Sequence, residues 1–248
     1  MQQPDHRVAD LVQAGQIRVA LFLPQYTNDA ATGKLYGVGT GFLAIEIARV
    51  LATRLGIQVL IVEHPTPPRA LESLKTGACD VAFLGIEASR SEQVDFSPPV
   101  VQFDYTYLVP AGSLIQCAAD ADQPGFRIAV VTSHASALAL NRIVKHAELV
   151  GSELPDVAFN LFRAGNASAF AFPRESLLDY SIKLPGSRVL SDSYGVNRVA
   201  MAVPKGQTGW LAYIREFIEE AKVSGLIHSA IERGGLRGFC VAPSQNPN

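Results

Sequence analysis

The chain has 248 residues, of which 48% are hydrophobic and 18% are charged, and its formal net charge is −2 at pH 7. This length allows one large domain or two lobes of ordinary size. Because Lys and Arg are scattered and the net charge is small, the composition excludes a nucleic-acid-binding or anionic-membrane surface, and no apolar run reaches the roughly 18 residues of a transmembrane helix.

The first part of the chain alternates between helical and extended patterns. Val8, Leu11 and Val12 have helical spacing, and Gly15 is a natural stop for that helix. Residues 17–24 form a short, almost wholly apolar run, which is typical of a strand buried on both faces of a parallel sheet. We then expect a long turn-rich loop over 25–41, a helix over 44–56, strands over 57–64 and 79–86, and a loop over 87–99.

The second part continues the alternation. After an extended segment at 104–110, the pattern predicts a strand over 127–133, a helix over 136–150, a strand over 167–172 and an extended return over 187–206. The last long amphipathic helix covers 210–235, with a break at Gly225.

One pattern occurs twice. It occupies 15–24 and 69–85 in the first copy, and 124–133 and 157–170 in the second. Each copy predicts a strand, helix, strand, helix, glycine turn and strand, and a carboxylate in the first copy has no counterpart in the second. Matching positions are Gly77 and Gly165, Ala70 and Ala158, and Leu74 and Phe162.

The repeat predicts an α/β fold with two α/β lobes, a two-segment hinge and a ligand cleft between the lobes. The chain enters the second unit near residue 108 and leaves it near residue 198, so it crosses between lobes twice. Lobe 1 would comprise 1–108 and 198–248, and lobe 2 would comprise 109–197. Two parallel crossing segments are a natural hinge for domain closure.

No metal or cofactor is expected. The three cysteines are not at metal-ligand spacing, and they are too few for a disulfide-stapled scaffold. The five histidines include no pair at i, i+4 spacing, so a zinc site is not predicted. The GVGTG segment at 37–41 lacks the lysine of a phosphate-binding loop.

Five segments together resemble a known family. These segments, at 11–20, 32–37, 74–83, 90–99 and 201–206, resemble the bilobal solute-binding proteins of ABC importers, which have the type II periplasmic binding protein fold. The likeness is greatest to the cluster related to polar amino acid binding proteins, and it spans about 11–235. It implies a monomer that binds a small-molecule carboxylate solute, with an ABC importer membrane subunit as partner and no nucleic acid.

Arg90 is the first candidate for the solute site. It follows the third predicted strand, at the carboxyl edge of a parallel sheet, where α/β folds bind ligands. In the resembling family an arginine here clamps the solute carboxylate, which suits a bidentate guanidinium. The alternative is a surface arginine paired with Glu87 or Glu92. Phe83 and Gly85 are predicted to line the floor of the site.

A second group of candidates opens the first helix of lobe 2. Thr132, Ser133 and Ser136 stand at this helix N-terminus, whose free N–H groups and positive dipole favour a carboxylate. Ser133 could instead only cap the helix. His134 could donate to an anion, or it could be a solvated loop histidine.

Aromatic residues are candidates for covering the solute. Tyr26 and Tyr36 lie in the long first loop and could cover the solute, or they could pack within the loop itself. Phe172, together with Phe170, could form an apolar wall, or both rings could point into the core of lobe 2.

One departure from the family affects the predicted solute. Amino acid binders of this type carry aspartates after the second glycine turn, which hold the α-ammonium group. Here Ser168 stands at the first of these positions and Phe172 or Pro173 at the second. A buried ammonium without a carboxylate costs about several kcal/mol. We therefore expect a carboxylate that is not an ordinary α-amino acid, unless another acid replaces the missing one.

The leading hypothesis is a binding protein without catalytic activity. One alternative is a lyase resembling cyclohexadienyl dehydratase, for which Glu175 or Glu87 would be the proton donor. The other is a cytoplasmic or tethered solute sensor, because the first 16 residues lack the pattern of a signal peptide. The expected location is periplasmic if a signal peptide has been removed, and cytoplasmic otherwise.

Overall fold

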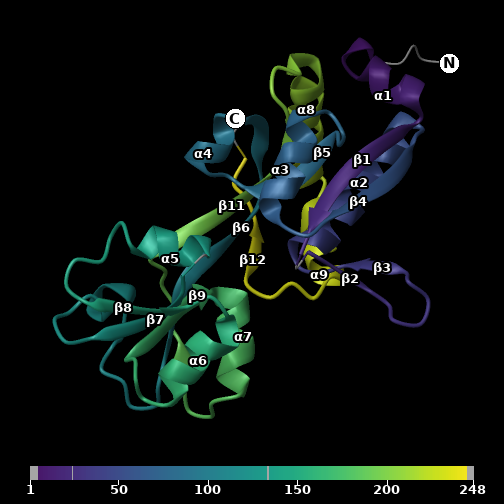
Figure 1. Ribbon diagram of the computed structural model, residues 1–248. Helices are drawn as coiled ribbons and strands as arrows, with labels where there is room; N and C mark the ends of the chain where they lie inside the picture. Colours follow the sequence, from purple (N-terminus) through teal and green to yellow (C-terminus); the bar gives the residue numbers. More distant parts are fainter. Residues whose placement is uncertain (1–4, 24, 133, 245–248) are drawn as a thin grey trace. The chain divides into compact units, whose positions relative to one another are not determined.

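The computed structural model describes residues 5–23, 25–132 and 134–244 (Figure 1). The chain divides into two compact units. Unit 1 comprises Met1–Gln102, Arg198–Leu236 and Cys240–Asn248, and unit 2 comprises Phe103–Asn197 and Arg237–Phe239. Residues 103–108 and 237–239 thus belong to unit 2, although they were expected in lobe 1. The reason for the first difference is that the strand β6 (Val94–Val109) runs through the predicted boundary and pairs with unit 2 strands from Tyr105 onward.

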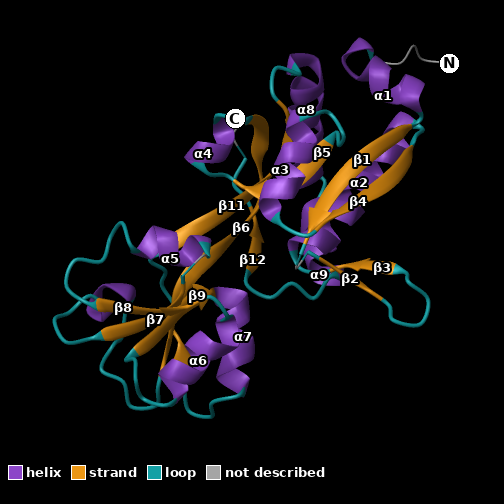
Figure 2. Ribbon diagram, in the orientation of Figure 1, coloured by secondary structure: helices purple, strands orange, loops and turns teal. Residues whose placement is uncertain are grey.

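Unit 1 contains a mainly parallel sheet. Its order is β4 (Gln58–His64), β1 (Gln16–Phe22), β5 (Val81–Gly85) and β11 (Gly195–Pro204). The first three strands are parallel, and β11 is antiparallel to β5 (Figure 2). Central strand β1 is buried along most of its length, as its apolar run predicts.

Helices supply the rest of the unit 1 core. Along the central strands alternate residues face opposite sides of the sheet, so Ala20, Ala82 and Leu84 pack with Leu74 of α3 on one side. The helices of unit 1 are η1 (His6–Val8), α1 (Ala9–Ala14), α2 (Thr40–Leu55), α3 (Pro67–Lys75), α4 (Ala88–Ser91), α8 (Thr208–Val223) and α9 (Leu226–Arg233). A hairpin of β2 (Tyr26–Asn28) and β3 (Leu35–Gly37) forms a separate small sheet.

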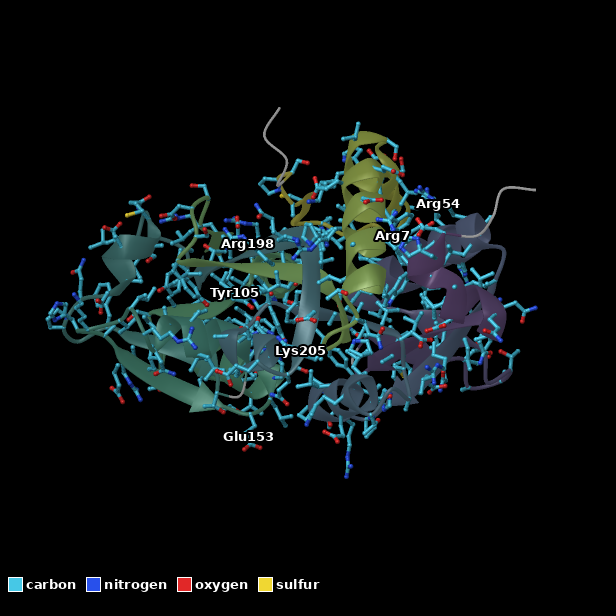
Figure 3. All side chains as sticks on the ribbon, turned by 90° about the horizontal axis from the view of Figure 1, so that it is seen from above. Arg7, Arg54, Tyr105, Glu153, Arg198 and Lys205 are labelled. Carbon is cyan, nitrogen blue, oxygen red and sulfur yellow. The ribbon has the colours of Figure 1, made fainter. Side chains whose placement is uncertain are left out.

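The amino-terminal segment is held against α8. The guanidinium carbons of Arg7 and Arg54 lie 5.5 and 5.6 Å from the ring centroid of Tyr213, and both arginines lie beside α8 in Figure 3. Arg7 also forms an ion pair with Glu216 of the same helix, with Nη1 and Oε1 2.6 Å apart. No helix in the described part of the chain is long and apolar enough to cross a membrane.

Unit 2 repeats the arrangement of unit 1. Its strands follow the order β6, β9 (Ala169–Pro173), β7 (Arg127–Val131) and β8 (Glu148–Ser152), with β10 (Arg188–Val189) also paired to β6. Strand β7 is parallel to both β8 and β9. The helices are η2 (Ala118–Ala121), α5 (Ala135–Leu140), α6 (Pro155–Arg163) and α7 (Arg174–Ile182), and the last strand of the chain, β12 (Phe239–Val241), pairs with β6.

The predicted repeat is confirmed in detail. Apart from the β2–β3 hairpin inserted after β1 in copy 1, each copy runs strand, helix, strand, helix, strand, and in each the first of these strands lies between the other two. Gly77 and Gly165 both adopt a left-handed backbone, with φ of 70° and 79°, at the turn after the second helix of their copy. The matched residues Ala70 and Ala158 are both fully buried.

The predicted helix over 136–150 is wrong beyond its first turns. Helix α5 ends at Leu140, and residues 148–152 form β8 instead. The side chain of Asp122 accepts hydrogen bonds from the backbone N–H groups of Lys145, His146 and Ala147, at 2.8–3.2 Å. These bonds hold the segment in a turn, and local periodicity could not reveal them because Asp122 is distant in sequence. The predicted loop over 87–99 likewise contains α4 and the start of β6.

Candidate functional site

Arg90 lies at the carboxyl edge of the unit 1 sheet, as predicted. It belongs to the short helix α4, and its Nη1 donates a 2.9 Å hydrogen bond to the carbonyl of Gly85, the last residue of β5. The alternative pairing with Glu87 or Glu92 is not present, and Arg90 is in no ion pair with any described carboxylate. One edge of the guanidinium is therefore anchored, while its other donors remain available to an anion.

The two residues predicted to line the floor of the site, Phe83 and Gly85, differ in burial and in the contacts that they make. The Phe83 side chain is only 1% exposed and lies in the core, so it offers no surface to a solute. Its carbonyl oxygen accepts a hydrogen bond from Gln25. Gly85 is half-buried at the end of β5, and its carbonyl anchors Arg90.

Gln25 was not among the predicted site residues, yet it links three segments at this edge. Its side chain is buried and joins the loop after β1 to the start of α2 and to β5. The only sequence signal was a polar residue directly after an apolar strand. The signal was weak because many other residues of the same loop are polar as well.

The two tyrosines of the hairpin have different surroundings. The hydroxyl of Tyr26 lies 3.4 Å from the carbonyl oxygen of His64, and burial raises the pKa of this hydroxyl. Tyr36 is 47% exposed, and Lys34 Nζ lies 5.3 Å from its ring centroid. Tyr26 thus packs within unit 1, whereas Tyr36 presents its ring to solvent. Their predicted role in covering a solute stays a prediction.

The loop after β7 was predicted to receive the anion in lobe 2. Thr132 is exposed, and Ser133 lies outside the described residues. Ser136 is fully buried, and both its backbone N–H and its hydroxyl contact Nδ1 of His134, at 3.1 and 2.8 Å. Ser136 is already bonded inside unit 2, so of the two described hydroxyl candidates it is Thr132 that faces solvent.

His134 is not a solvated loop histidine. It caps α5 through Nδ1, which accepts from Ser136, so the ring proton is on Nε2. The imidazole packs 4.7 Å from the ring of Phe172, and burial lowers the pKa of His134 to about 4. At neutral pH the ring is therefore uncharged, and it can offer an anion at most one neutral Nε2–H donor.

Phe172 does not form a wall in the way predicted. Phe170 and Phe172 are 0% and 8% exposed, stack 5.6 Å apart, and belong to one core cluster of unit 2. They share one face of β9 because residues two apart in a strand point to the same side. The alternative, in which both rings fill the core, is the one observed.

The two positions expected to carry aspartates lie at opposite ends of β9. Ser168 precedes the strand, and its N–H donates to the carbonyl of Arg127 at the amino end of β7. Pro173 ends the strand and lies at the carboxyl edge. Only the position of Phe172 or Pro173 is therefore near the predicted solute side of unit 2.

Two other carboxylates near this edge are already engaged. Asp104 forms an ion pair with Arg174 at 3.3 Å, and the Asp192 carboxylate accepts from the backbone N–H of Ala118 at 2.8 Å. Glu153, which directly follows β8, is exposed and is in no ion pair with a described residue, and Glu175 is a second exception. Its Oε2 is buried without a hydrogen-bond partner among the described residues, and burial raises the pKa of this carboxyl to about 7.

A pocket of about 440 Å³ lies elsewhere in unit 1, at the amino ends of β1 and β5. Each of the four cations in its wall is already paired with a carboxylate: Arg7 with Glu216, Arg18 with Asp80, Lys75 with Glu72 and Lys205 with Asp95. It therefore lacks the uncompensated charge that Arg90 provides. Among the described residues, no group of three or more His, Cys, Asp or Glu side chains could hold a metal ion.

Comparison with known proteins shows which family this arrangement resembles. The family model for bacterial extracellular solute-binding proteins, family 3, matches residues 25–233. No curated protein matches the chain significantly.

Similar solved structures include a binding component of an ABC transporter from Wolinella succinogenes in complex with lysine (23% identity, 88% of this chain and 95% of that chain, TM-score 0.70). A substrate-binding protein of an amino acid ABC transporter from Streptococcus pneumoniae, bound to L-arginine, has 20% identity over 91% and 97% of the two chains, with a TM-score of 0.67. An ancestral amino acid-binding protein described as a precursor of cyclohexadienyl dehydratase has 24% identity over 91% of this chain and 97% of that chain, with a TM-score of 0.67. At these identities the likeness shows the fold, and the predicted α/β fold class is confirmed.

Proposed function

Because the chain belongs to the bacterial extracellular solute-binding proteins of family 3, we propose that it binds a small carboxylate-bearing organic solute for an ABC importer. The observation that carries this proposal is the Arg90 guanidinium. It is anchored on the Gly85 carbonyl at the carboxyl edge of β5 and is in no ion pair with a described carboxylate. A fixed, uncompensated guanidinium suits bidentate binding of a carboxylate.

The proposed solute has no α-ammonium group, unlike the amino acids bound by the similar structures. The position where the family has its second aspartate is Phe172 or Pro173, and both side chains are buried. Asp104 and Asp192 are held by partners within unit 2. A cationic amine beside these groups would thus have no free carboxylate other than the buried Glu175 and the exposed Glu153, and a buried amine without a partner costs about several kcal/mol.

A thermal-shift panel of matched pairs tests the solute class. Each pair contains an α-amino acid and the same acid without its amino group, for aliphatic, aromatic and dicarboxylic members. A ligand at about 100 times its Kd adds roughly 2.7 kcal/mol, which shifts Tm by about 5–10 °C for a chain of this size. We expect shifts from the deaminated acids only. A shift from an amino acid and not from its deaminated partner would contradict this solute class.

Arg90→Ala tests the anchoring residue. Loss of a charge-assisted contact should weaken binding at least about 100-fold while leaving the melting temperature of the unliganded protein nearly unchanged. Arg69→Ala is the matched control, because Arg69 is an exposed arginine of the same unit. Unchanged affinity in Arg90→Ala would remove Arg90 from the site.

A second candidate function, a lyase activity, is favoured by one observation. A carboxyl whose pKa is about 7, as at Glu175, is half-protonated at neutral pH and can give a proton to a leaving group. Incubation of the purified protein with prephenate or arogenate, followed by spectroscopic detection of the aromatic product, separates the two functions. Turnover abolished by Glu175→Gln would favour the lyase, and no turnover would favour binding alone.

The proposed importer role also predicts where in the cell the protein acts. A protein that delivers solute to an importer acts on the outer side of the cytoplasmic membrane, whereas the alternative of a solute sensor allows a cytoplasmic location. Fractionation of cells that express the natural gene distinguishes the two. Release with the periplasmic fraction supports delivery to an importer, and retention in the cytoplasm supports the sensor.

A further inference from the structure

We infer that Gln25 is a positioning residue of the solute site, which fixes an exposed apolar rim relative to Arg90 and so gives the site its preference for carboxylates with an apolar body. This inference rests on the proposed function. The apolar rim consists of the side chains of Leu23, Val38 and Ile86, which are 50%, 47% and 37% exposed.

The Gln25 side chain makes three hydrogen bonds, which use both of its donors and its acceptor oxygen once. It is 5% exposed, and its Nε2 donates to Thr40 Oγ1 at 3.1 Å and to the carbonyl of Phe83 at 3.0 Å. Its Oε1 accepts from the backbone N–H of Phe22 at 3.3 Å. One amide therefore ties the end of β1, the first residue of α2 and strand β5 to one another. A buried amide with all these groups paired is costly to replace, because each lost partner leaves an unsatisfied polar group.

The backbone of Gln25 adds further contacts at this junction of β1, α2 and β5. Its carbonyl accepts from the N–H of Val38 at 2.8 Å, which places Val38 of the rim directly beside it. Gly41, in the first turn of α2, approaches so closely that a Cβ there would lie 1.8 Å from the Gln25 carbonyl oxygen. Only glycine allows this contact, so the start of α2 is packed directly against Gln25.

The junction restrains the distance between the apolar rim and Arg90. Leu23 precedes Gln25 by two residues, and Val38 is bonded to it. On the other side, Phe83 leads through Gly85 to Ile86, and Gly85 holds Arg90. Strands β1 and β5 already pair at Val19–Val81 and Ala20–Ala82, and the bond from Gln25 to Phe83 adds a link nearer the carboxyl ends, between the Leu23–Val38 part of the rim and the strand that leads to Ile86 and Arg90. Without it, only the strand pairing further back, at 19–20 and 81–82, would restrain the separation of the two parts of the site.

This arrangement predicts which part of a solute depends on Gln25. The carboxylate is held by Arg90 whether or not the rim is fixed. The apolar body gains affinity only if the rim is already in place, because ordering loose side chains on binding offsets the gain. A change at Gln25 should therefore affect long acids and spare short ones, whereas general destabilisation of unit 1 would weaken both equally.

Titration calorimetry with straight-chain carboxylates from propanoate to octanoate tests the inference. For the wild-type protein we expect the affinity to rise up to about fourfold per methylene, the factor that burial of each CH₂ allows. In Gln25→Met, which keeps the size of the side chain and removes its hydrogen bonds, the rise should fall below about twofold per methylene. Propanoate should bind within about twofold of wild type.

Two further variants keep the test decisive. Thr27→Ala changes an exposed residue of the hairpin and should keep the wild-type rise. If circular dichroism shows that Gln25→Met does not fold, Thr40→Val replaces it in the test. Thr40→Val removes one of the two acceptors of the Gln25 amide, and its rise in affinity per methylene should lie between those expected for wild type and Gln25→Met.

The outcomes separate this inference from the proposed function. A wild-type protein that binds no acid in this series or in the matched-pair panel overturns the proposed function and the inference with it. Binding that does not strengthen with chain length, or a rise that is unchanged in folded Gln25→Met or Thr40→Val, overturns the inference alone. In that case Arg90 would still be tested independently by Arg90→Ala.

Discussion

The two copies of the α/β repeat have the same strand pairing but different residues at the ends of their strands. In unit 1 Val19 of β1 pairs with Val81 of β5, and in unit 2 Ile128 of β7 pairs with Ala169 of β9, so the same register recurs at equivalent places. At the carboxyl edge, copy 1 presents an anchored and uncompensated arginine. The same edge of copy 2 carries the neutral, half-buried imidazole of His134.

The amino edges differ as well, and this difference identifies the carboxylate that copy 2 lacks. In copy 1 Asp80 accepts two hydrogen bonds from the Arg18 guanidinium, at 2.6 and 3.0 Å. In copy 2 Ser168 replaces the aspartate, and the matching Arg127 pairs with Glu148 of the neighbouring strand. The comparison teaches that the repeat conserves strand pairing, which sets the fold, while the residues at strand ends are free to differ and decide stability and binding.

The largest effect is expected from breaking the ion pair of copy 1. In Asp80→Ser, which gives copy 1 the residue of copy 2, Arg18 loses a partner whose side chain is only 13% exposed. We expect a loss of about 3 kcal/mol in the free energy of unfolding of unit 1. Urea denaturation followed by the fluorescence of Trp210, the single tryptophan, reports on this unit because its Nε1 lies 3.3 Å from the Asp80 carbonyl oxygen.

The matched control for this variant is Glu72→Ser. Glu72 forms only an exposed surface pair with Lys75, so its loss should cost well under about 1 kcal/mol. Equal effects of the two substitutions would show that the Asp80 pair contributes no more than a surface pair.

A pH-dependent effect is expected from the unpaired carboxyl of unit 2. The pKa of Glu175 is raised to about 7 in the folded chain, above its ordinary value of 4.5, so the folded state binds a proton more tightly than the unfolded state. Stability from this group is therefore complete below pH 4.5 and is lost as the pH rises through 7. Glu175→Gln should stabilise the protein by roughly 2 kcal/mol at pH 8 and have little effect at pH 4.5.

Thermal unfolding between pH 4.5 and 8 measures this difference. Glu153→Gln, at an exposed glutamate of the same unit, should leave the pH dependence of the wild type unchanged. A constant difference between Glu175→Gln and wild type across this pH range would mean that the carboxyl titrates normally.

The two glycine turns should respond alike. Gly77 and Gly165 have φ of 70° and 79°, and a Cβ at either position would meet no atom within 4 Å. Substitution by alanine should cost about 1 kcal/mol at each site through backbone strain alone. Gly195→Ala, where φ is not positive and the nearest contact of a Cβ would be 3.4 Å, should cost much less. Clearly unequal losses at the two turns in chemical denaturation would show that the copies are not equivalent there.

The smallest effect is expected from restoring the aspartate of copy 2. Ser168→Asp places a carboxylate at the position equivalent to Asp80, beside Arg127, and this exposed pair should add at most about 0.5 kcal/mol. Because Ser168 lies at the amino edge of β9, the variant should not acquire affinity for amino acids. New binding of an amino acid in the thermal-shift panel would contradict the placement of the solute at the carboxyl edge.

Most of the fold followed from local patterns in the sequence. The repeat, the buried strands and the glycine turns were predictable, because apolar periodicity and left-handed turns depend on residues close together in the chain. The helix expected over 136–150 failed where a distant carboxylate, Asp122, bonds the backbone of 145–147. The prediction that 237–239 belong to lobe 1 differs from the structure for a similar reason: Arg237 pairs with Asp179 of unit 2, far away in sequence.

For the candidate site, the sequence by itself determined the family, the fold and the place of Arg90 after a buried strand. Only the tertiary structure decided that the guanidinium is unpaired, that Phe172 fills the core, and that burial keeps His134 neutral. It also assigned Gln25, whose partners come from three separate segments. The physical reason is that strand pattern is a property of neighbouring residues, whereas burial, pKa and hydrogen-bond partners depend on groups that only folding brings together.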